Sequence, residues 1–119
     1  MHLAEVPILV VVCAVFAALY RSDAELGRPE IVGGASIYPS VQNLLLAART
    51  EGLGACLTTL LCADEPEVKQ LLGIPEDVIT AAMIPLGYPE RPLPTKLSRR
   101  PLAEIVYADR YGAPVFTRP

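Results

Sequence analysis

Residues 36–59, SIYPSVQNLLLAARTEGLGACLTT, carry the clearest structural signal in this sequence. The pattern predicts a helix over residues 36–51, because apolar side chains recur there at the spacing of one helical face. Pro39 falls in the first turn, where proline is tolerated, and Gly52 and Gly54 end the helix. The apolar positions are Ile37, Val41, Leu44, Leu45 and Ala48.

A second helix is predicted over residues 65–72. Asp64 stands at its start with Glu67 three positions later, which is the spacing of a capping box. Gly73 ends this helix, and the proline that follows two residues later prevents its continuation. The next apolar run predicts a central strand over residues 78–84, with Pro85 marking a bulge or an edge.

The N-terminal run PILVVVCAVFAALY, residues 7–20, carries no charge. It is shorter than the ~20 residues that span a bilayer, so we expect no transmembrane helix. Its β-branched block at residues 8–12 favours a strand buried on both faces. The alternative is the apolar region of a signal peptide in a small secreted protein, although the preceding residues include Glu5 and no Lys or Arg.

The remaining segments are irregular. Residues 21–34 are a charged connector that contains glycine and proline breakers. Residues 89–101, PERPLPTKLSRRP, form a proline-rich basic loop without apolar periodicity. After it, AEIVY and PVF are short strand candidates, and residues 113–119 form a tail. The whole chain, residues 1–119, is therefore expected to be one α+β domain with a central antiparallel or mixed sheet flanked by helices.

Composition excludes several classes of function. With 10 Lys and Arg against 13 Asp and Glu, the formal net charge of -3 argues against nucleic-acid binding. A hydrophobic content of 52% in 119 residues indicates that the chain completes its core with a partner subunit. Cys13, Cys56 and Cys62 form an odd set without zinc-site spacing, which favours a reducing cytoplasm. We predict no metal site and no catalytic side chain, since no nucleophile or acid–base constellation emerges.

Several short sequence strings, spread along the chain, occur in an order that indicates a protein family. An apolar strand is followed by YPSVQNLLLAARTEGLGACLTT, a helix ending LLGIP, a strand ending IPLGYP, and then KLSRRPL. Over about residues 5–112 this order resembles the FMN-dependent nitroreductase family. The resemblance implies a nitroreductase-like α+β fold, a homodimer with the helix over residues 36–51 in its interface, FMN as cofactor and NAD(P)H as reductant. It also implies hydride transfer through the flavin to a small-molecule acceptor, such as a nitroaromatic compound or a quinone.

The resemblance further implies which residues contact the flavin. The backbone of residues 57–62 would pass the isoalloxazine ring, with Thr59, Leu60 and Leu61 beside it. Lys96 and Arg99 would hold the FMN phosphate, and Arg100 would replace Arg99 if the register differs by one. The alternatives are that residues 57–61 are only a buried turn and that the cations only solvate a proline-rich loop.

Members of the family begin with an arginine-rich segment and helices that hold the other side of the flavin, and none of that precedes Pro7. We therefore expect a truncated partial domain, a misassigned start, or one half of a split protein. The main alternative to an oxidoreductase is a non-catalytic remnant that retains only a dimerisation surface.

Overall fold

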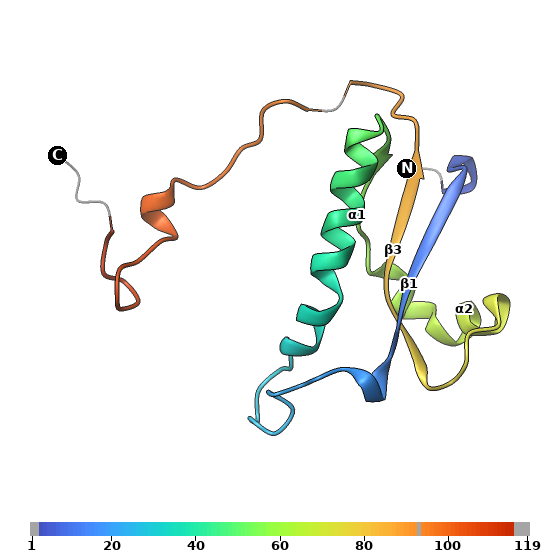
Figure 1. Cartoon of the computed structure of the whole chain (residues 1–119), viewed down its shortest axis with the longest axis horizontal. Helices are drawn as coiled ribbons and strands as arrows, with labels where there is room; N and C mark the ends of the chain where they lie inside the picture. Colours follow the sequence, from blue (N-terminus) through green and yellow to red (C-terminus); the bar gives the residue numbers. More distant parts are fainter. Residues whose placement is uncertain (1–2, 93, 116–119) are drawn as a thin grey trace.

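The computed structural model describes residues 3–92 and 94–115. In this part of the chain, a three-stranded sheet has the order β1-β3-β2 and lies beside two α-helices (Figure 1). The predicted α+β class is confirmed, and the sheet is antiparallel throughout. The elements are β1 (Ile8–Val15), α1 (Tyr38–Thr50), β2 (Gly54–Ala55), α2 (Glu65–Leu72) and β3 (Val78–Gly87), with the 3-10 turns η3 (Val32–Ser36) before α1 and η4 (Leu60–Asp64) before α2.

The helix predicted over residues 36–51 is confirmed as α1, which begins two residues later because η3 occupies the preceding turn. Pro39 lies in its first turn, as expected. Gly52 adopts a φ of 76°, a left-handed conformation that favours glycine and turns the chain out of the helix. Val41 and Ala48 are the buried residues of α1, and their burial anchors the helix to the body of the protein.

β3 is the central strand, as predicted, and six consecutive residues from Thr80 to Pro85 are buried. Ile84 is fully enclosed, with 0% of its surface exposed. β1 pairs with β3 from Ile8 opposite Leu86 to Val15 opposite Val78. The prediction that this N-terminal strand is buried on both faces was wrong. β1 is half-exposed because it lies at the edge of the sheet.

Pro85 marks neither the bulge nor the edge predicted there, because it lies within the central strand and away from the register shift. The register shift lies between Val12 and Cys13, whose partners are Ala82 and Thr80, so Ala81 is the extra residue on β3. Pro85 pairs with Leu9 inside the strand. Alternate residues of a strand bond to the same side, and Met83 bonds to Thr58 on the side away from β1. The backbone nitrogen of Pro85 faces this same side and has no hydrogen to donate. Proline therefore interrupts the pairing of β3 with β2.

α2 begins after Asp64 and ends at Gly73, whose φ is 66°. The predicted capping box is not formed, since the Asp64 side chain makes no capping hydrogen bond. Glu65, the next residue, directs its carboxylate to β3 instead.

After Gly87 the chain leaves the body as an extended arm (Figure 1). Neither of the two strands proposed in it is formed by its described residues. The described part of this region has a 3-10 turn at Leu102–Glu104 and a single bridge between Tyr107 and Pro114, while residue 116, the last of the PVF string, lies outside the described residues.

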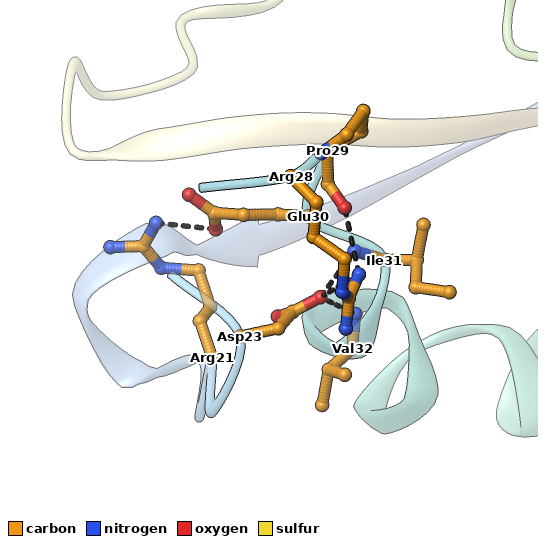
Figure 2. Close-up of polar contacts among 7 residues, drawn as sticks. All are labelled: Arg21, Asp23, Arg28, Pro29, Glu30, Ile31 and Val32. Carbon is orange, nitrogen blue, oxygen red and sulfur yellow. Dashed lines mark hydrogen bonds and ion pairs between the residues drawn. The ribbon is translucent and has the colours of Figure 1, made fainter. Parts of the chain in front are cut away.

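The connector is folded around the carboxylate of Asp23, which is only 1% exposed (Figure 2). Its Oδ2 accepts hydrogen bonds from the N–H groups of Ile31 at 2.8 Å and Val32 at 3.2 Å. Arg28 donates to the same oxygen at 3.2 Å. The bond from Ile31 is the main reason that the pKa of Asp23 lies below its ordinary value, with burial opposing it. A segment without regular structure therefore has one defined conformation.

Candidate flavin site

The segment that joins β2 to η4 runs along the outer edge of the sheet. Thr58 exchanges two backbone hydrogen bonds with Met83 of β3, at 3.0 and 2.8 Å. Because backbone groups alternate along an extended chain, the N–H groups of Leu57 and Thr59 point away from β3. Within residues 3–92 and 94–115, neither of these two groups donates a hydrogen bond. The edge therefore offers free backbone donors to a ligand.

Thr80 anchors the other end of this segment. Because Ala81 is an extra residue on β3, Thr80 directs its N–H and C=O to the same side as Met83. Glu65 Oε1 accepts hydrogen bonds from the Thr80 N–H and, at 2.7 Å, from its hydroxyl. The Cys62 thiol donates to the Thr80 carbonyl at 3.4 Å. Residues 59–61 are thus held between two attachment points on β3.

The two bonds from Thr80 also favour the charged form of Glu65. They lower its pKa from the ordinary 4.5, the backbone N–H most strongly and the hydroxyl next. Burial opposes the shift, and the nearby ammonium of Lys69 adds to it. Glu65 is therefore an anionic acceptor at neutral pH.

A cavity of about 450 Å³ opens beside the segment. Its volume lies within the range of small-molecule sites, about 300–1,000 Å³. Thr59 and Cys62 line one side, and the connector lines another. There Arg21 pairs with Glu30 at 2.7 Å and lies over the Phe16 ring at 4.3 Å.

Tyr38 also lines this cavity. It donates its hydroxyl to the Ala81 carbonyl at 3.2 Å, which ties the start of α1 to the bulge. The cavity is therefore lined by the stretch from Phe16 to Tyr38, by Thr59 and Cys62, and by β3.

The structure places the predicted site residues in two separate groups. Thr59, Leu60 and Leu61 lie together at the start of η4, where Thr59 lines the cavity and Leu60 is 81% exposed. Lys96, Arg99 and Arg100 are exposed on the arm, which extends away from η4 (Figure 1). The Arg99 guanidinium bonds to the carbonyl of its neighbour Ser98 at 2.9 Å. Within one chain, the cations and the segment at residues 59–61 do not form one site.

The residues that hold this segment in place were not predicted from the sequence. Glu65 and Thr80 are fifteen positions apart and belong to no motif, so only the fold reveals their contact. Tyr38 was visible only as part of a helical string. Its position in the first turn of the helix was the one available signal.

Comparison with known proteins decides the family. The model of the nitroreductase family matches residues 2–88. The chain belongs to this family. The predicted resemblance to this family is therefore confirmed, and the matched residues end before the KLSRRPL string.

Two archaeal nitroreductase relatives match part of the chain. The "Putative NADH dehydrogenase/NAD(P)H nitroreductase" of Methanothermobacter thermautotrophicus is 46% identical over 50 residues, which cover 40% of this chain and 26% of that protein. A protein of the same name from Archaeoglobus fulgidus is 36% identical over 53 residues, covering 43% and 30%.

Solved structures confirm the nitroreductase-like fold. NfrA2 of B. megaterium superposes with a TM-score of 0.69 at 23% identity, covering 90% of this chain and 47% of its own. The NADPH:FMN oxidoreductase of Vibrio harveyi, complexed with NAD+, gives 0.65 at 26% identity, covering 87% and 46%. The chain thus spans about half the length of these structures. No helix in the described part of the chain has the length and hydropathy needed to cross a membrane.

Proposed function

We propose that the chain is part of an FMN-dependent NAD(P)H oxidoreductase of nitroreductase type, acting on nitroaromatic or quinone-like acceptors. The observation that carries this proposal is the open sheet edge at residues 57–59. Among the described residues, the N–H groups of Leu57 and Thr59 donate no hydrogen bond there, and Thr59 lines a cavity of about 450 Å³. Bound FMN would supply the redox chemistry, taking a hydride from NAD(P)H and passing electrons to the acceptor. Free thiols at Cys13, Cys56 and Cys62 suit a reducing cytoplasm.

The residues at this edge fit the flavin ring. Its pyrimidine edge and N5 are hydrogen-bonding groups, and backbone N–H groups are suitable partners for the acceptors among them. The N–H groups of Leu57 and Thr59 would hold these acceptors, since their strand neighbour Thr58 already uses its own N–H on Met83. The protein's part is then to bind and orient the ring, with no side chain acting as acid or base.

The phosphate would be held by Lys96 and Arg99, or by Arg100 in place of Arg99. A phosphate favours charge-assisted donors, and a guanidinium supplies two of them in fixed geometry. These cations are exposed and available, but they lie on the arm. The proposed site therefore needs the arm to approach the segment at residues 59–61, in the same chain or in a second copy within a homodimer.

Titration of FMN into the purified chain tests the phosphate assignment. Arg99→Ala removes a hydrogen bond to a charged group, which is worth about 1.5–3 kcal/mol, so the Kd should rise by about tenfold to a hundredfold. Arg110→Ala is the matched control, because Arg110 is an exposed arginine on the same arm. It should leave the Kd almost unchanged. Quenching of FMN fluorescence measures both values.

The outcomes separate the parts of the proposal. Equal losses in the two variants would mean that Arg99 has no special role at the phosphate. If the wild-type chain binds no FMN, the oxidoreductase proposal fails and the non-catalytic remnant is favoured. NAD(P)H consumption with a quinone or a nitroaromatic compound, measured on flavin-loaded protein, tests the acceptor class.

A further inference from the structure

We infer that Glu65 is a positioning residue for the flavin-facing backbone, which it holds in place through Thr80. The inference rests on the proposed function, because it assigns a role to a side chain that the flavin itself does not touch. It concerns residues 59–61, whose position relative to β3 decides where their N–H groups point.

The two attachment points of this segment differ in kind. On one side, Thr58 is bound to Met83 by backbone groups alone. On the other side, Thr80 is held by side chains. Its N–H and hydroxyl donate to the carboxylate of Glu65, the Cys62 thiol donates to its carbonyl, and its hydroxyl also lies 3.6 Å from the Cys62 sulfur. Three residues separate Thr58 from Cys62, and six separate it from Glu65. Glu65 accepts two of the bonds at the second attachment, including the bond from the Thr80 N–H, so its loss would weaken the hold on this end of the segment.

The sheet explains why a carboxylate is needed at this place. β2 ends at Ala55, so among the described residues no strand accepts the N–H of Thr80, which the bulge at Ala81 turns to this side. Thr80 is 5% exposed, and a buried N–H without a partner is strongly unfavourable. The carboxylate of Glu65 accepts this hydrogen bond, as a strand carbonyl otherwise would. Asp64 makes no capping hydrogen bond at the start of α2, and Glu65 is the residue there that bonds to β3.

Three substitutions separate positioning from general stability. Glu65→Ala removes both bonds to Thr80 and should raise the Kd for FMN by about tenfold. Glu65→Gln retains an oxygen that can accept both bonds and should restore most of the affinity. Glu67→Ala is the matched control, because Glu67 is an exposed acidic residue in the same helical turn. It should bind FMN like the wild type.

Two readouts report position rather than folding. The midpoint potential and visible spectrum of bound FMN should shift in Glu65→Ala and return in Glu65→Gln, since N–H groups near the ring tune its electronics. In the flavin-free protein, amide exchange at Leu60 and Cys62 should become faster in Glu65→Ala, while Ala48 in α1 remains protected. If Glu65→Ala does not fold, Glu65→Asp takes its place, because it keeps the charge and loses the reach.

The results distinguish this inference from the proposed function. Unchanged FMN affinity, spectrum and amide exchange in Glu65→Ala would overturn the positioning role while the wild type still binds FMN. A wild type that binds no FMN would overturn the proposed function, and the exchange at Leu60 and Cys62 would then show whether Glu65 orders the segment at all. A uniform rise in exchange across α1 and η4 would also overturn the inference, since it would show a purely structural role.

Discussion

Asp23 shows how one carboxylate orders a segment that has no helix or strand. One of its oxygens, Oδ2, accepts hydrogen bonds from two backbone N–H groups and an arginine (Figure 2). The other oxygen, Oδ1, is buried and has no hydrogen-bond partner among the described residues. The pKa of Asp23 is lowered chiefly by the N–H of Ile31, and burial acts in the opposite direction. The charged form is therefore favoured by folding.

This lowered pKa predicts how Asp23→Asn depends on pH. A group with a lowered folded-state pKa stabilises the protein fully above its ordinary value, here 3.8, and less as the pH falls through the folded value. The Tm difference between wild type and Asp23→Asn should thus be largest near about pH 6 and shrink towards about pH 3. Thermal unfolding followed by circular dichroism measures it. A difference that stays constant over this range would contradict the prediction.

At the scale of single residues, the sequence indicated contacts between neighbours better than contacts across the fold. Gly52 and Gly73 were identified as helix ends because a left-handed turn is a local property. The partner of Glu65 could not be predicted, since it depends on how β3 is placed. The flavin contacts of residues 59–61 came from family resemblance alone, and they remain predictions.

At the scale of elements, periodicity and breakers predicted α1, α2 and β3, because each has a local pattern of apolar residues and a glycine or proline boundary. β1 was predicted as a strand, but its burial was not. The β-branched block indicates a preference for extended structure. Burial depends on the order of the strands in the sheet, which a single sequence does not indicate. The prediction of strands in the arm was wrong, because a short apolar string forms a strand only where it can pair with the edge of a neighbouring strand.

The end of α2 gives a clean test of backbone conformation. Gly73 has a φ of 66°, and a Cβ added there would have no neighbouring atom within 4 Å. Gly73→Ala should therefore cost about 1 kcal/mol of unfolding free energy from backbone strain alone, without a clash. Gly73→Asn should cost less, because asparagine tolerates the left-handed region. Urea unfolding measures both, and equal stability of Gly73→Ala and wild type would contradict the assignment.

At the scale of the whole molecule, the chain is more extended than a compact domain of the same length. Its radius of gyration is 18.5 Å, whereas a compact domain of this size has roughly 13–14 Å. The arm accounts for much of this, and it carries exposed apolar side chains such as Tyr88 at 86% and Tyr111 at 93%. Apolar surface on this scale is unfavourable in water, so a partner that covers it would stabilise the protein.

We expect that partner to be a second copy of the chain, with α1 in the interface. Leu46 of α1 is 55% exposed, although the same helix buries Val41 and Ala48 on its other side. Leu46→Lys places a charge on this outer side, and burying it against a partner would be costly. The wild type should scatter light as a dimer at micromolar concentration, and Leu46→Lys should shift it towards the monomer. Leu71→Lys on α2, where Leu71 is 83% exposed, is the control and should remain dimeric. A well-folded monomeric wild type, or dissociation by both variants alike, would contradict an interface on α1.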